Sequence, residues 1–194
     1  MFKIKTNATG YDGINLRMLL YLIPFLSPHI TYIINLCLRC GQFPEYWKTA
    51  NVIPVPKKTN ATELAHYRPI SILPTFSKNI ERIMADQINT FLNANTILPS
   101  TQSGFRHRHS TTTALLGVTD DLFRAFDKIL CSCLVLLDYS KAFDTIDHRV
   151  LTIKLKYYGF GENALNLIKN YFINRKQRVV LSGNFSDLRT INRG

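Results

Sequence analysis

Apolar side chains recur at helical spacing along three long stretches of this chain. In the first, Ile14–Gly41, the pattern is interrupted at Pro24, which predicts a break there and a second helix that begins at Ser27–Pro28 and ends at the glycine. The second stretch predicts a helix over about Phe76–Leu92, and the third predicts one over Ser110–Phe126 with the serine as its cap.

Shorter segments have the composition and boundaries of β-strands. Asn51–Pro56 holds two prolines, which lack the N–H that a central strand uses, so we expect it at the edge of a sheet. Tyr67–Pro74 predicts a second short extended segment. Ile129–Asp138 is an uninterrupted apolar run that ends on a carboxylate, a pattern typical of a central strand covered on both faces. A turn at Ser182–Asn184 predicts a β-hairpin near the end of the sequence.

Two further helices, Thr145–Tyr158 and Glu162–Ile173, are expected between that apolar run and the hairpin. Asp144 and Asp147 stand at the start of the first of them, an arrangement typical of an N-terminal cap. Together the elements indicate an α+β fold that is mostly helical, with a small and mainly antiparallel sheet.

The chain is strongly basic. Its 24 Lys and Arg residues against 13 Asp and Glu give a formal charge of 24 − 13 = +11. Because 46% of its 194 residues are hydrophobic and no run is biased, it can form a core, which excludes a disordered basic tail. The basic residues are interleaved with aromatic ones and are not collected on one amphipathic helix. This indicates nucleic acid, more than a membrane, as the polyanionic partner.

No targeting or membrane segment is expected. The longest apolar stretch, Met18–Leu26, is short and contains Pro24, which argues against a transmembrane span. The basic segment Met1–Asn7 is not followed by an apolar one, which argues against a signal peptide. Four cysteines are too few for a disulfide framework and fit a reducing compartment, so we expect an intracellular protein.

One carboxylate has a position suited to metal chemistry. Asp138 ends the apolar run, and a carboxylate at the end of a buried strand can bind a hard cation such as Mg²⁺. Two-metal phosphoryl transfer needs at least one further carboxylate, but Asp144 and Asp147 are both better explained as helix caps. The alternatives stay open at this point: Asp138 is a metal ligand whose partner is missing, or it merely ends a strand.

Two basic features could bind phosphate groups. In the loop Gln102–His109, Arg106 and Arg108 follow Gly104 and Phe105 and could bind phosphates while the Phe105 ring stacks on a base, although a solvated loop has the same composition. Arg68 precedes a proline on a short strand and could reach a triphosphate, or could pair with a surface acid.

Four segments, in this order, carry a resemblance to the reverse transcriptase of non-LTR (LINE-type) retrotransposons, with most likeness to the jockey/CR1-like branch. The likeness extends from about Gly10 to Gly194, and four long motifs in the right order are far more specific than any one alone. The segments are FPEYWKTANVIP at 43–54, YRPISILP at 67–74, QSGFR at 102–106 with STT at 110–112, and LDYSKAFDTIDH at 137–148.

The resemblance implies the fingers and part of the palm of a right-hand polymerase, which copies an RNA template onto a DNA primer from deoxynucleoside triphosphates with two Mg²⁺ ions. Matched by position, Asp138 is the first catalytic aspartate, and the backbone carbonyl of Tyr139 helps to hold the second ion. Phe143 matches the aromatic gate that stacks under the sugar and rejects a ribose 2′-hydroxyl. Arg68 matches the arginine that contacts the incoming triphosphate.

The resemblance also assigns a region to the basic loop and divides the chain. Gly104, Phe105 and Arg106 fall in the segment that lies against template and nucleotide, while Asp144 remains a helix cap. The implied division is a helical extension at 1–48, the fingers at 49–128 and a partial palm at 129–194.

The chain departs from the family after the hairpin. There the family has a Gly-Val-Pro-Gln-Gly-type segment and then a Tyr-x-Asp-Asp turn that supplies the remaining catalytic carboxylates. Neither is in this sequence, whose one Asp-Asp pair, Asp120–Asp121, precedes Asp138. We therefore expect a fragment that is inactive alone. Two alternatives stay open: a non-catalytic nucleic-acid-binding remnant, and a chain that does not fold stably because its half palm leaves a sheet edge uncovered.

Overall fold

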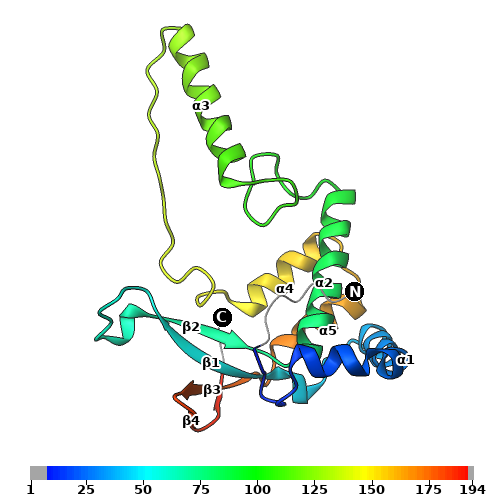
Figure 1. Cartoon of the computed structure of the whole chain (residues 1–194). Coiled ribbons are helices and arrows are strands. Elements are labelled where there is room, and N and C mark those ends of the chain that lie inside the picture. The colour runs from blue at the N-terminus through cyan, green and yellow to red at the C-terminus, as the bar shows by residue number, and fades with distance from the viewer. Residues whose placement is uncertain (1–7, 192–194) are drawn as a thin grey trace. The chain divides into compact units, whose positions relative to one another are not determined.

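The computed structural model describes residues 8–191 (Figure 1), which form two compact units. The first unit contains the described residues up to Asp86 and those from Ala142 on, and the second contains Gln87–Lys141. The predictions that rest on Met1–Asn7 and Asn192–Gly194 lie outside the described residues. The division at residues 48 and 128 follows the family resemblance and stays a prediction.

The first helix, α1, runs without interruption over Leu16–Cys40, so the predicted break at Pro24 is wrong. Pro24 and Pro28 are four residues apart and remove backbone donors from the same side of the helix, which can continue by bending there. Figure 1 shows α1 changing direction along its length. The predicted end is confirmed, because Gly41 caps the helix in the left-handed conformation at φ 64°.

With no break at Pro24, α1 is longer than the apolar stretch considered from the sequence. Within residues 8–191 it alone has the length and composition to cross a membrane. A single helix of this kind is weak support for a membrane span. The share of its apolar window that is buried is 11%.

The sheet is small and mixed, and its strand order is β2-β1-β3-β4, with β5 also paired to β3. β1 pairs antiparallel with β2 and parallel with β3, and β3 pairs antiparallel with both β4 and β5. The strands are β1 (Thr49–Pro56), β2 (Tyr67–Ile72), β3 (Lys176–Leu181), β4 (Asn184–Phe185) and β5 (Arg189–Thr190). The predicted α+β class and hairpin are confirmed.

β1 is a central strand, so its predicted place at the sheet edge is wrong. β3 pairs only with Thr49–Val52, and this pairing ends before Pro54. Beyond that point β1 is bonded on one side only, to β2. The prolines therefore lie in the part of β1 that has a partner on one side only. A proline has no N–H to donate, and at this position no second strand needs one.

The predicted helices form, with one shifted start. Ser110 caps α3 by accepting from the Thr113 N–H at 3.1 Å, as expected. The helix that follows the apolar run starts three residues later than predicted, and its cap is Asp147, so Asp144 does not cap it. The bounds are α2 (Thr75–Ala94), α3 (Thr111–Asp127), α4 (His148–Tyr157) and α5 (Glu162–Phe172), with short 3₁₀ turns at Glu45–Lys48 and Leu64–His66.

The core of the first unit lies between α1, α2, α5 and the segment that enters β1. Ile80 of α2 is fully buried, and Phe43, which precedes β1, is nearly so. The Phe43 N–H donates to the Asn170 side chain at 2.7 Å, which fixes this segment to α5. The other buried members of the cluster are Ile34, Cys37 and Leu167. Figure 1 shows the β1–β2 hairpin extending away from this group of helices.

The apolar run Ile129–Asp138 does not form the predicted strand. It is an irregular segment whose apolar side chains are exposed, and Figure 1 draws it as a trace without an arrow. A strand needs a neighbour that accepts and donates backbone hydrogen bonds. Among the described strands none pairs with this run, so its hydrophobic composition alone cannot bury it.

A half-buried carboxyl group, that of Glu81, connects α2 with α5. The Tyr171 hydroxyl donates to Glu81 Oε1 at 2.9 Å, and the Ser77 hydroxyl donates to the same atom at 3.1 Å. Burial raises the pKa of Glu81 above its ordinary value, against the lowering effect of the Tyr171 hydrogen bond and of the Arg175 charge. The folded chain therefore holds a proton at Glu81 at a pH where the unfolded chain has released it.

Glu81→Gln should remove one source of pH dependence from folding. Because the pKa of Glu81 is raised in the folded chain, its protonated carboxyl group contributes stability. This contribution is complete below the pKa that Glu81 has in the unfolded chain, and it is lost as the pH rises through the pKa in the folded chain. We expect the stability of Glu81→Gln relative to the parent to increase as the pH rises above the ordinary carboxyl pKa of about 4.3, as measured by urea unfolding. Glu162→Gln, at an exposed position, is the control. A constant difference between Glu81→Gln and the parent at all pH values would contradict the assignment.

Candidate functional site

Asp138 and Tyr139 lie in the irregular segment at the end of the second unit, with Tyr139 largely exposed. A divalent ion needs several oxygen ligands from converging groups. Within residues 8–191, no three His, Cys, Asp or Glu side chains come together as a possible metal site. The donor set that these residues supply therefore does not fit a bound metal ion.

Phe143 lies in the first unit, in the turn that precedes α4, and its ring is mostly exposed. Asp147 accepts hydrogen bonds from the N–H groups of Arg149 at 2.8 Å and Val150 at 3.2 Å. The bond from Val150, then that from Arg149, lowers the pKa of Asp147. This carboxylate is committed to capping the helix, as the sequence predicted.

Arg68 lies on β2, opposite Val55 of β1, and is exposed to solvent. No carboxylate in the described part of the chain forms an ion pair with it. The alternative in which Arg68 pairs with a surface acid thus has no support from residues 8–191. Its guanidinium group is held on a paired strand and faces water, as an anion-binding group would.

The basic loop is shaped by one of its own arginines. Arg106 Nη1 donates to the carbonyl oxygens of Pro99 at 3.0 Å and Gln102 at 3.4 Å. Phe105 has a positive φ of 57° and a side chain that is 92% exposed, and the space beside Gly104 is open. Arg106 therefore organises the loop, while Phe105 offers its ring to solvent.

The two units hold different members of the candidate site. Arg68 and Phe143 belong to the first unit. Asp138, Tyr139 and the loop residues 104–106 belong to the second. The structure therefore describes these two sets of groups separately.

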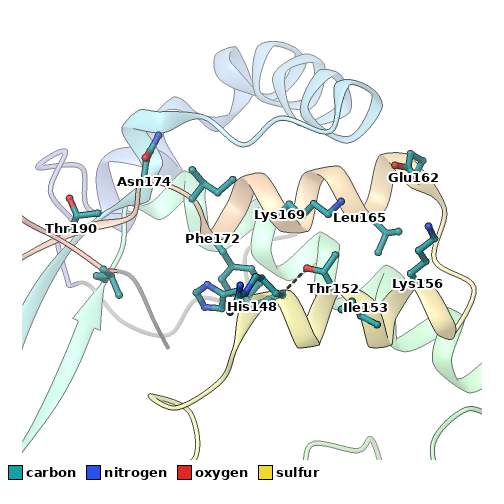
Figure 2. Close-up of a pocket in the computed structure, with 13 residues that line it drawn as sticks. His148, Thr152, Ile153, Lys156, Glu162, Leu165, Lys169, Phe172, Asn174 and Thr190 are labelled. Atoms are coloured by element: carbon teal, nitrogen blue, oxygen red, sulfur yellow. Dashed lines mark hydrogen bonds between the residues drawn. The ribbon is translucent and has the colours of Figure 1, made fainter.

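Sequence reasoning missed an open cavity of about 640 Å³ between α4 and α5. His148, Thr152 and Lys156 line it from α4, and Lys169 and Phe172 line it from α5. Figure 2 shows Lys156 reaching from α4 toward α5, with Lys169 along the cleft side of α5. The signal in the sequence is the four-residue spacing that places His148, Thr152 and Lys156 on one face of a helix.

The model of the family described as "Reverse transcriptase (RNA-dependent DNA polymerase)" matches residues 55–193. The match includes β2, the basic loop, the apolar run and the α4–α5 pair. The matched range also contains the candidate site residues, which are Arg68, Gly104, Phe105, Arg106, Asp138, Tyr139 and Phe143.

The curated proteins to which the chain is similar include the following three from Drosophila melanogaster. It is 33% identical over 86% of its length to the probable RNA-directed DNA polymerase from transposon BS. It is 36% identical over 87% to the corresponding protein of transposon X-element, and 29% identical over 96% to the RNA-directed DNA polymerase from mobile element jockey. The chain spans only 18–20% of the length of these relatives.

Proposed function

The chain belongs to the reverse transcriptase family, as a fragment homologous to the RNA-directed DNA polymerases of non-LTR retrotransposons, and on that premise we propose that it forms the fingers and the first part of the palm of a right-hand polymerase. The observation that carries the proposal is the family match over 55–193, together with an exposed Arg68 on the β1–β2 hairpin that forms no ion pair within residues 8–191. In this proposal 1–48 is a helical extension, 49–128 the fingers and 129–194 the partial palm.

The proposed roles follow the matched positions. Arg68 contacts the triphosphate of the incoming nucleotide, for which its rigid guanidinium fork is suited. Phe143 lies under the sugar and rejects a ribose 2′-hydroxyl. The segment Gly104–Arg106 lies against the template, where the exposed Phe105 ring can stack on a base.

The family generally uses a divalent metal ion, and we propose Mg²⁺ for the complete domain, with Asp138 and the carbonyl of Tyr139 among its ligands. The ion would supply charge neutralisation at the transferred phosphoryl group. Because the residues described here do not form a metal site, we propose that the 194-residue chain does not polymerise by itself.

A second candidate function is a nucleic-acid-binding remnant without catalysis. The net charge of +11 favours it, because Lys and Arg side chains release the counterions condensed on a polyanion. Both candidates predict an RNA template and a DNA primer, or single strands, as partners. The two candidates differ in one expected result. DNA synthesis should return when the missing Tyr-x-Asp-Asp segment is supplied if the chain is part of a polymerase, and should not return if the chain is a binding remnant.

The purified chain should bind a primed RNA template but fail to extend the primer. We expect affinity that falls steeply with salt and little preference for sequence. Fluorescence anisotropy measures the binding, and a gel assay with Mg²⁺ or Mn²⁺ measures extension, with Asp138→Asn as the matched control. Primer extension that is lost in Asp138→Asn would contradict the inactivity, and no binding at low salt would contradict both candidate functions.

A further inference from the structure

α4 and α5 form an antiparallel helical hairpin with an open cleft between them (Figure 2). On α4, His148, Thr152 and Lys156 follow one another at intervals of four and share one face. On α5, Lys169 and Phe172 are three residues apart and line the facing side. The cleft is therefore built by two short, regular stripes of side chains.

The hairpin holds the cleft in a defined shape. At one end the His148 ring stacks on Phe172, with ring centres 4.1 Å apart and planes 17° from parallel. The Thr152 hydroxyl donates to the His148 carbonyl at 2.7 Å, a bond drawn in Figure 2, so its donor is satisfied within α4. Leu165 is buried beneath the cleft and gives it an apolar floor.

The lining of this cleft carries a positive charge. Its charged side chains are Arg149, Lys156 and Lys169, with one acid, Glu162. Neither Lys156 nor Lys169 forms an ion pair within the described range 8–191. At the rim Arg149 is 91% exposed and its contact with Asp147, at 3.5 Å, is exposed too, so that pair neutralises little.

Two ammonium groups in one cleft with an apolar floor favour an anion more than the same groups on a flat surface, because low-dielectric walls focus the field. Lysine binds phosphate as a point charge that tolerates several approach angles. The cleft is open to solvent, which fits a polymer strand lying in it better than an enclosed small molecule.

We infer that the α4–α5 cleft binds the sugar–phosphate backbone of a nucleic-acid strand, with Lys156 and Lys169 each contacting a phosphate. The inference rests on the proposed function, because it assigns a new contact to the nucleic acid that the chain is proposed to bind. It lies outside the positions matched to nucleotide, template or metal, which end at Phe143.

The test compares Lys156→Gln/Lys169→Gln with Lys154→Gln/Lys128→Gln, a control that removes two exposed charges elsewhere. Binding of a labelled single-stranded RNA is measured by anisotropy over a range of salt concentrations. Each lost phosphate contact lowers the slope of log K against log salt by about 0.7 for single strands, so the cleft variant should lose about 1.4. Its affinity should fall about tenfold near physiological salt, while the control changes much less.

A second measurement does not depend on variants. Acylation of lysines in the parent chain, read by mass spectrometry, should be slowed by bound RNA at Lys156 and Lys169 but not at Lys154. Equal affinities and slopes for the two double variants, or equal protection of all three lysines, would overturn the inference. So would displacement of the RNA by polyglutamate at equal charge concentration, which would indicate a general anion surface.

The outcomes separate the inference from the proposed function. If the parent binds RNA and the cleft variant binds equally well, the cleft assignment fails and the proposed function stands. If the parent binds no RNA even at low salt, the proposed function fails and takes the cleft assignment with it.

Discussion

Ile80→Ala lowers the free energy of unfolding by about 2–5 kcal/mol, the range for truncating a fully buried large aliphatic side chain. Ile80 has no exposed surface and lies where α1, α2 and α5 meet around Phe43. Alanine at this position removes contacts to all of them at once and leaves a cavity that the three helices cannot easily fill. Since domains of this size are stable by only about 5–15 kcal/mol, much of the margin disappears.

Urea unfolding monitored through Trp47, which is packed against this cluster, measures the effect. Ile129→Ala is the matched control, because the same atoms are removed from a side chain that is 95% exposed. It should change stability by no more than about 0.5 kcal/mol. Similar losses for the two variants would show that Ile80 is not at the centre of the core.

We expect the chain to self-associate through the apolar run 129–138, and Leu134→Lys/Leu136→Lys should strongly reduce this association. Both leucines belong to the apolar run 129–138, which is exposed and unpaired, uncharged up to Asp138, and free of proline. Such a segment can form backbone hydrogen bonds with a second copy of itself. Burying one leucine contributes about 1.5–3 kcal/mol, so losing two lowers the association constant by about 100-fold or more.

Light scattering and sedimentation over a range of protein concentrations measure this effect. Leu115→Lys/Leu116→Lys on α3 is the control, because those leucines are similarly exposed but lie in a helix whose backbone donors are satisfied. If both variants reduce association equally, exposed hydrophobic area alone is responsible and the unpaired strand is not. If neither does, the run does not drive association.

Helix boundaries were predicted well where the stop or start signal is local. Ser110 caps α3 and Gly41 ends α1 because each interaction involves backbone groups within about four residues. The start of α4 was displaced from Asp144 to Asp147 because both aspartates carry the same chemical signal. The chain forms a turn through Phe143 and Asp144, so the helix begins after Asp147 and this aspartate caps it.

Strand predictions depended on partners that the sequence does not name. β1 contains two prolines and yet is central, because its neighbour β3 pairs with the half that precedes them. The apolar run 129–138 has the composition of a buried strand and is exposed, because no described strand pairs with it. The composition of a segment indicates whether it is apolar enough to be buried in a sheet. Whether it is buried depends on a neighbouring strand with which its backbone can pair.

The sequence by itself determined the family, the mostly helical α+β class, most helix limits and the residues proposed for nucleotide contact. These features depend on sequence motifs and on interactions between residues that are only a few positions apart in the chain. Three features became visible only in the folded chain: α1 continues through its prolines, Glu81 is half-buried against Tyr171, and Lys156 and Lys169 line the same cleft. Each depends on which distant segments pack together, and that is set by the summed burial and hydrogen bonding of the whole unit.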